Sequence, residues 1–119
     1  MRQFKRSQRL GEQILRDISS LLEIELSEVA PGMVTFTQVR LSDDLRYAKV
    51  YYSYLGSDEG REWIVGYFER EKGRIRSQIG RKLRIRHIPE FTFTFDPSVE
   101  HGMRIEQLLD GLKREDNQD

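Results

Sequence analysis

A dense run of basic side chains is the part of this sequence whose residue types and spacing could do chemistry. Six Lys and Arg residues fall between Arg74 and Arg86, five of them arginines, and no acidic residue lies between Glu71 and Glu90. The planar guanidinium group of arginine holds a phosphate at two points and stacks on bases. Complementing a helix dipole explains only one or two such charges, at about 0.3 to 1 kcal/mol each, and a merely soluble face usually mixes both signs. We therefore favour phosphate binding, and predict RNA contacts from Arg74, Arg76, Arg81, Lys82, Arg84 and Arg86.

A second basic group lies at the start of the chain. Its members recur at spacings of four and three residues, so a helix that extends back to the start would place them in one stripe. The stripe comprises Arg2, Arg6, Arg9, Gln13 and Arg16. From this region we predict further RNA contacts by Arg2, Lys5, Arg6 and Arg9.

The charges of the whole chain are segregated along the sequence. The 20 basic and 20 acidic residues cancel, yet the net charge is +4 over residues 1–16, −6 over 17–69, +7 over 70–86 and −5 over 87–119. Segregation of this kind indicates an oriented contact with a polyanion rather than general stickiness.

Catalytic and metal-binding patterns are weak by comparison. The chain has no cysteine, and His87 and His101 lie in different predicted elements, so neither a cysteine nucleophile nor a metal site is expected. Short polar clusters near predicted turns are more typical of turns and helix caps than of catalysis, and they comprise Asp43, Asp44, Asp96 and Ser98. We expect no catalytic residue, no cofactor and no metal, and therefore a binding protein rather than an enzyme.

Four tyrosines in one predicted strand offer a different way to bind RNA. Aromatic side chains on a strand can stack on bases, as they do on the sheet of an RRM domain. Alternating aromatic residues in a hairpin more often pack in the core and across strands. We favour that packing role for Tyr47, Tyr51, Tyr52 and Tyr54.

The elements that must position the basic residues follow from the apolar spacing. Apolar residues at three- and four-residue intervals predict a first helix over about 7–28, which Pro31 and Gly32 end. The segments MVTFTQVRLS and YAKVYYSYLG flank a polar connection and predict an antiparallel hairpin.

The basic run is predicted to lie on a third helix. Ser57 is a suitable N-cap for a second helix that reaches about Arg70, and Gly73 then interrupts the pattern. Apolar residues at a spacing of four mark the third helix, namely Ile75, Ile79 and Leu83. On a helical wheel, Arg74, Arg81 and Arg84 fall roughly opposite these apolar residues.

A last strand and a short helix complete the predicted elements. Pro89 leads out of the third helix, and alternating Phe and Thr residues predict a strand over 91–95 whose Phe face is buried. We predict one domain over 1–112, with a core at about 7–97, a C-terminal helix at about 99–112 and a disordered tail at 113–119.

The expected cellular compartment follows from the lack of membrane-spanning and secretory segments in the sequence. No apolar run approaches membrane-spanning length, and the N-terminal segment has no apolar region of a secretory signal. We therefore expect a cytoplasmic protein without a membrane partner.

The predicted order of helix, strand, strand, helix, helix, strand is that of a type II KH domain. This α+β fold packs a three-stranded sheet against helices and binds single-stranded nucleic acid where its two adjacent helices meet. The usual GxxG loop at that junction is absent, because none of the nine glycines has a glycine three residues later. The sequence therefore predicts a KH-like frame without the usual single-strand grip.

The sequence also resembles a known family, ribosome-binding factor A, over about residues 5–112. The N-terminal segment RSQRLGEQILRDISSLL is similar to the opening helix of the family. The most specific part is RIRSQIGRKLRIRHIPEFTFTFDPSVEHGMRIEQLL, where the matching residues are Arg86, Pro89, Glu90, Phe93, Asp96, Ser98 and Gly102. The resemblance implies a type II KH-like fold in which a kinked helix pair, commonly at an Ala-x-Gly element, replaces the GxxG loop. Glu71-Lys72-Gly73 matches only the glycine of that element.

The same resemblance implies a function. Members of the family bind the free small (30S) ribosomal subunit at its decoding-side neck, through small-subunit (16S) rRNA, and assist a late step of its maturation. They are especially important in the cold, and a ribosome-associated GTPase displaces them. For this chain the resemblance thus implies a cold-adaptation factor with the small subunit and its rRNA as partners, and we expect a monomer.

Two other functions remain open from the residues alone. One is a generic single-stranded RNA module, against which the missing GxxG loop counts. The other is a protein-interaction domain whose arginines only confer solubility, against which the unmixed basic blocks count. If the RNA-binding assignment is right, replacing Arg74, Arg81 and Arg84 together with alanine should weaken rRNA binding while leaving the fold intact.

Overall fold

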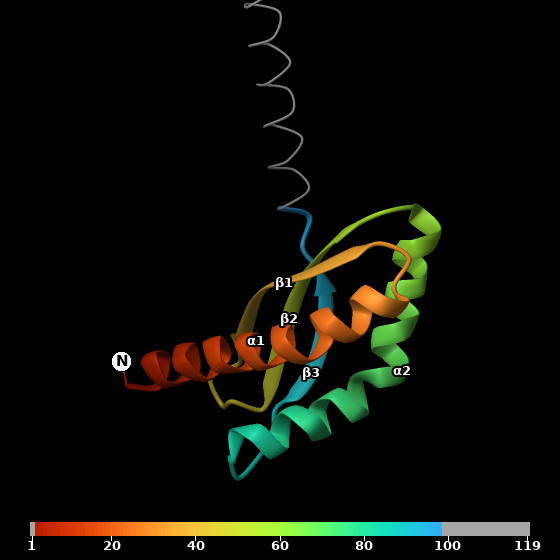
Figure 1. Ribbon diagram of the computed structural model, residues 1–119. Helices are drawn as coiled ribbons and strands as arrows, with labels where there is room; N and C mark the ends of the chain where they lie inside the picture. Colours follow the sequence, from red (N-terminus) through yellow and green to blue (C-terminus); the bar gives the residue numbers. More distant parts are fainter. Residues whose placement is uncertain (1, 99–119) are drawn as a thin grey trace, which may run out of the picture.

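The computed structural model of the protein describes residues 2–98, with side chains from residue 6 onward. Two helices pack against a three-stranded sheet in the order α1-β1-β2-α2-β3 (Figure 1). This arrangement confirms the predicted KH-like α+β fold. The helix predicted at about 99–112 and the tail at 113–119 lie outside the described residues.

Helix α1 (Arg2–Val29) lays one apolar stripe on the sheet. Ile14, Ile18, Leu22 and Leu26 recur every four residues and are at most 2% exposed, as their spacing predicts. The helix begins before residue 7, so the basic residues near the start of the chain belong to its first turns.

Strands β1 (Met33–Leu41) and β2 (Tyr47–Leu55) form the predicted antiparallel hairpin. A bulge interrupts the register between Phe36 and Gln38. The turn between the strands is held by the Asp44 carboxylate, which accepts hydrogen bonds from Ser42 Oγ at 2.7 Å and from the backbone nitrogen of Arg46 at 3.1 Å. The acidic pair at 43–44 therefore contributes to a turn, as expected.

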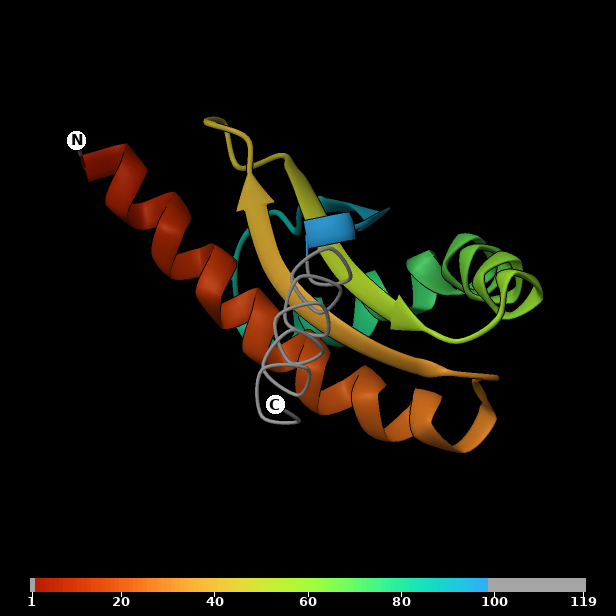
Figure 2. The same ribbon diagram turned by 90° about the horizontal axis from the view of Figure 1, so that it is seen from above.

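Helix α2 (Asp58–Leu83) is one continuous helix where the sequence predicted two. Gly73 lies inside it with a helical backbone, and a Cβ at this position would meet nothing within 4 Å. The axis of α2 nevertheless changes direction near its middle, so the expected kink takes the form of a bend (Figures 1 and 2). The helix continues because buried residues on both sides of the bend, including Phe68 and Ile75, outweigh the cost of one helical glycine, about 1 kcal/mol.

The first turn of α2 agrees with its sequence signals. Ser57 is the N-cap, and its side chain accepts a hydrogen bond from the backbone nitrogen of Gly60 at 3.0 Å. Asp58 and Glu59 lie in the first turn, where negative charge complements the helix dipole.

Strand β3 (Glu90–Phe95) lies parallel to β2 and completes a sheet of order β1-β2-β3. The buried Pro89 precedes the strand, and Phe91 is 3% exposed, whereas Phe93 and Phe95 are partly buried. Phe93 stacks on Phe68 of α2 with 4.3 Å between ring centroids. Because β3 is parallel to β2, the connection that follows α2 returns to the end of the sheet where the hairpin turn lies.

Candidate nucleic-acid interface

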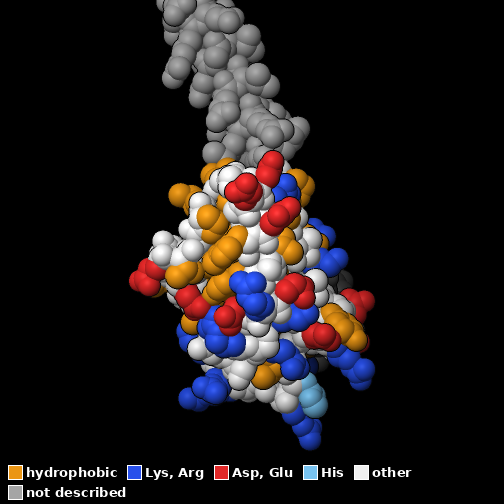
Figure 3. Space-filling model, turned by 90° about the vertical axis from the view of Figure 1, so that its right-hand side faces the viewer, with side chains coloured by type: hydrophobic (Ala, Val, Ile, Leu, Met, Phe, Trp, Pro, Cys, Tyr) orange, Lys and Arg blue, Asp and Glu red, His pale blue; other side chains and the backbone are white. Residues whose placement is uncertain are grey.

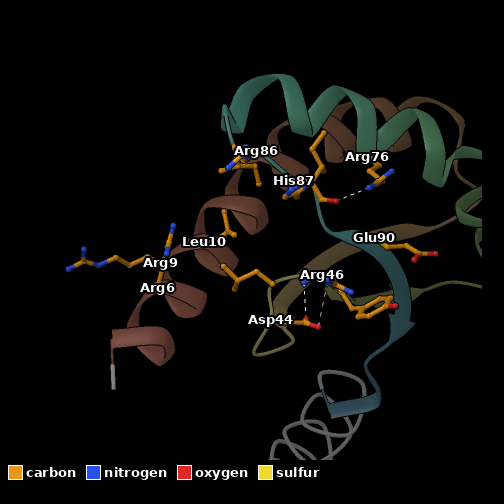
Figure 4. A pocket seen from close by; sticks show the side chains of 13 residues that line it. Arg6, Arg9, Leu10, Asp44, Arg46, Arg76, Arg86, His87 and Glu90 are labelled. Carbon is orange, nitrogen blue, oxygen red and sulfur yellow. Dashed lines mark hydrogen bonds and ion pairs between the residues drawn. The ribbon is translucent and has the colours of Figure 1, made fainter.

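Three segments that are distant in sequence meet at one end of the sheet and form a cleft of about 960 Å³ (Figure 4). They are the beginning of α1, the hairpin turn, and the C-terminal half of α2 with the connection from α2 to β3. Figure 3 shows that Lys and Arg side chains gather toward one end of the molecule, with acidic and apolar side chains among them. Five exposed arginines line the cleft, namely Arg6, Arg9, Arg46, Arg76 and Arg86. We call this feature the arginine cleft.

The α2–β3 side of the arginine cleft is fixed by hydrogen bonds from a side chain of α2 to the backbone of the connection, and by close packing. Arg76 donates hydrogen bonds to the backbone oxygen of Ile88 at 2.7 Å and to that of Pro89 at 3.1 Å. Ile88 packs so closely on α2 that a Cβ on Gly80 would collide with its side chain. Arg84 ends α2 with a left-handed backbone, φ 51°, which turns the chain toward Arg86.

The hairpin side is fixed by the turn and by a bond to β3. Hydrogen bonds from the Ser42 side chain and from the backbone of Arg46, together with the Arg46 charge, hold the pKa of Asp44 below its usual value despite some desolvation. The backbone oxygen of Arg46 accepts a hydrogen bond from the backbone nitrogen of Glu90 at 2.8 Å. Arg46 is therefore held between the turn and the first residue of β3.

The predicted RNA-binding residues separate into groups in the structure. The arginine cleft brings together Arg6 and Arg9 of the first group with Arg76 and Arg86 of the second. Three further residues are exposed near the C-terminal end of α2 without lining the cleft, namely Arg81, Lys82 and Arg84. The side chains of Arg2 and Lys5 lie outside the described ones.

Arg74 lies apart from these groups, because its side chain is directed at α1. Its Nη2 lies 2.5 Å from Glu25 Oε1 and its Nε lies 2.8 Å from Glu71 Oε2. Its Nη1 also donates to Gln78 Oε1 at 2.9 Å, and Tyr67 donates its hydroxyl hydrogen to Glu25 at 2.6 Å. We call Glu25, Tyr67, Glu71 and Arg74 the interhelix clamp.

The clamp shifts the ionisation of its members. The hydrogen bonds that Arg74 donates to Glu71 and to Glu25 raise the pKa of Arg74, although burial alone would lower it. Burial and the hydrogen bond to Glu25 raise the pKa of Tyr67 to about 12. Burial alone would raise the pKa of Glu25, but the hydrogen bonds from Tyr67 and Arg74 and the Arg74 charge outweigh it and lower that pKa.

The clamp bears on the expectation that Arg74 can be replaced without affecting the fold, whereas RNA contact by Arg74 stays a prediction. A helical wheel gives only the direction of each side chain around the axis of its own helix. It therefore could not show that α1 lies beside Arg74. Because Arg74 joins the two helices, its loss is expected to weaken the fold, and an alanine triple variant that includes it does not isolate an RNA-binding effect.

Sequence reasoning missed part of the arginine cleft. Arg46, Tyr47 and His87 line it, yet none belongs to the predicted RNA-binding set. Arg46 lies in the stretch 17–69, whose net charge is −6, so counting charge by blocks hid it. The parallel pairing of β2 with β3, which places Tyr47 opposite Glu90, is the signal that could have found it.

The remaining candidates have structural roles. Asp96 is 8% exposed, and its carboxylate accepts hydrogen bonds from Ser98 Oγ at 2.6 Å, Ser98 N at 3.0 Å and Thr37 Oγ1 at 2.8 Å, which lower its pKa. Tyr52 and Tyr54 are buried in the core, which supports packing over base stacking for these two.

Within residues 2–98, no group of three or more His, Asp and Glu side chains is arranged to hold a metal ion. Neither α1 nor α2 is long and apolar enough to cross a membrane.

Comparison with known proteins identifies the family. The sequence model of ribosome-binding factor A matches residues 6–109. Ribosome-binding factor A of Desulfitobacterium hafniense (strain DSM 10664 / DCB-2) is 44% identical over 114 residues, covering 96% of this chain and 91% of the relative. The crystal structure of ribosome-binding factor A from Thermus thermophilus superposes with a TM-score of 0.62 at 24% identity, covering 74% of this chain and 93% of that one.

A second structural neighbour is a homology model of Thermus thermophilus ribosome binding factor A, fitted into a cryo-EM map of its complex with the 30S subunit. It superposes with a TM-score of 0.54 at 22% identity and covers 71% of this chain and 93% of that one. These structural likenesses agree with the fold, and the sequence matches extend over nearly the whole chain. The protein therefore belongs to the ribosome-binding factor A family.

Proposed function

We propose that this protein binds the free small ribosomal subunit through its rRNA and assists late maturation of 16S rRNA. The observation that carries the proposal is the arginine cleft, which gathers five exposed arginines at one end of the molecule. Guanidinium groups that are held apart on a rigid frame match the phosphates of a folded RNA by position. The protein acts by binding and positioning rather than by a chemical step.

Family membership supports the choice of partner. The family is named for ribosome binding, and a Thermus thermophilus member has been fitted into a 30S complex. Net charge supports the mode of binding, because a chain with 20 residues of each sign attracts RNA only through a face on which the basic ones are gathered.

The finer parts of the proposal rest on the family resemblance. They are action as a monomer in the cytoplasm, importance in the cold, and displacement by a ribosome-associated GTPase. Each is open to a direct measurement, respectively of the mass in solution, of growth at low temperature after deletion, and of release from subunits when such a GTPase is added.

Co-sedimentation across a salt series tests the proposal. The purified protein is mixed with free small subunits, large subunits or whole ribosomes. We expect selective binding to free small subunits, and if about four phosphates are contacted, log K should fall against log salt with a slope of roughly −3 to −4. Salt-independent binding would contradict the electrostatic account. Absence of binding to any particle, with retention on short single strands, would favour a generic single-stranded RNA module instead.

A further inference from the structure

Besides its five arginines and the acidic Asp44 and Glu90, the arginine cleft has an apolar part, which we call its floor. Four aliphatic side chains line it, each partly exposed, namely Leu10, Leu45, Ile85 and Ile88. They come from α1, from the hairpin turn and from the α2–β3 connection. Phosphate contact alone needs no apolar floor, and apolar surface open to water is stabilised when something apolar covers it. The cleft therefore fits an occupant that is apolar on its faces and anionic at its ends.

The rim of the cleft adds groups that stack on flat rings. Tyr47 is 57% exposed at the start of β2 and lies next in the chain to Arg46, and His87 is exposed on the opposite side. Aromatic rings and guanidinium planes stack on bases that are free of a partner strand. A base within a duplex is covered by its neighbours and cannot enter a cleft, so the lining selects an unpaired base.

We propose that the arginine cleft receives one unpaired nucleotide of rRNA, with its base against the aliphatic floor and its flanking phosphates on the arginines of the rim. This inference rests on the proposed function and names the part of the rRNA that the site takes. Gly73 does not line the cleft, which extends from Arg76 of α2 to the hairpin turn and the beginning of α1, so it takes in elements beyond the helix junction at which a KH domain grips single strands (Figure 4).

Leu45 offers a substitution that removes part of the floor with little risk to the fold. Its backbone has φ 61°, a left-handed conformation that asparagine adopts more readily than leucine. Leu45→Asn should therefore fold normally while replacing an apolar wall with a polar one. Leu55→Asn is the matched control, since Leu55 is 38% exposed at the other end of β2.

The test is footprinting of free small subunits with the wild-type protein and these two variants. Dimethyl sulfate reports the exposure of unpaired bases, and hydroxyl radicals report the exposure of the backbone. We expect the wild type and Leu55→Asn to protect at least one unpaired base within a backbone footprint. Leu45→Asn should keep the backbone footprint, lose the base protection and bind roughly tenfold more weakly, the order expected when one leucine contact is lost.

The two proposals fail in different ways. A backbone footprint without any protected unpaired base, or base protection that Leu45→Asn leaves unchanged, would overturn base insertion and leave rRNA binding standing. Absence of any footprint and of any binding to the subunit would overturn the proposed function itself. Thermal melting of each variant shows that a change in footprint comes from the cleft and not from unfolding.

Discussion

The hydroxyl group of Tyr54 is a buried polar atom without a hydrogen-bond partner among the described residues. The Tyr54 ring lies close to three glycines at the end of the sheet away from the arginine cleft. A Cβ on Gly32, Gly56 or Gly60 would come too close to the Tyr54 side chain. The glycines are therefore needed to admit the tyrosine, and the hydroxyl group it carries there is not stabilised.

A matched pair of substitutions tests this view of Tyr54. Tyr54→Phe removes only the unpartnered hydroxyl group and should raise the free energy of unfolding by about 1 kcal/mol. Tyr67→Phe removes a hydroxyl group that donates to Glu25 and should lower the free energy of unfolding by about 1 to 2 kcal/mol. Urea denaturation measures both, and a loss of stability in Tyr54→Phe would show that its hydroxyl group has a partner after all.

Arg74 and Arg81 are both arginines of the basic run, but only Arg74 is bonded to carboxylates of two helices. Arg74→Ala should lower the free energy of unfolding by about 1 to 2 kcal/mol, with its partial exposure taken into account. Arg81→Ala, at an exposed position, should change it by less than about 0.5 kcal/mol. Equal effects of the two substitutions on thermal melting would argue against the interhelix clamp.

At the scale of elements, the interhelix clamp makes the packing of α1 on α2 depend on pH. The folded-state pKa of Glu25 lies below its ordinary value of 4.5, so the unfolded chain binds a proton there more readily. The stabilisation is therefore present above about pH 4.5 and is lost as the pH falls through the lower folded-state pKa. Asp96 has a lowered pKa as well, so only a difference between variants isolates Glu25.

The experiment is thermal melting of the wild type and of Glu25→Gln between pH 7 and pH 2. Glutamine has nearly the same shape and does not titrate. The wild type should be the more stable at pH 7, and its advantage should shrink steadily below about pH 4.5. An advantage that stayed constant down to pH 2 would mean that the Glu25 carboxylate is not stabilised by the clamp.

Most elements could be predicted from their own sequences, because each buries a regular apolar pattern. The stripe of α1 and the cap at Ser57 are local signals, and both are confirmed. The kinked helix pair predicted around Gly73 is one bent helix, since the burial of residues such as Ile75 depends on α1 and the sheet. For the same reason, the bonding of Arg74 and the place of Arg46 could not be predicted, because each depends on an element distant in sequence.

At the scale of the whole molecule, zero net charge is compatible with RNA binding because the charges are arranged by position. Arginines from three segments meet at one end, namely the first turns of α1, the hairpin turn, and the C-terminal half of α2 with the connection that follows it. The sheet is the frame that fixes their separation, since β2 and β3 begin side by side there. RNA binding thus depends on where the basic side chains lie rather than on how many there are.

The most direct measurement compares two double variants in co-sedimentation with free small subunits across a salt series. Arg9→Gln with Arg86→Gln removes two charges from the arginine cleft, and Arg70→Gln with Lys72→Gln removes two exposed charges elsewhere on the molecule. The account predicts that the cleft variant binds more weakly and that its salt slope is smaller by about 2, while the control binds like the wild type. Equal loss of binding in both variants, or no loss in either, would contradict the assignment of rRNA binding to the arginine cleft.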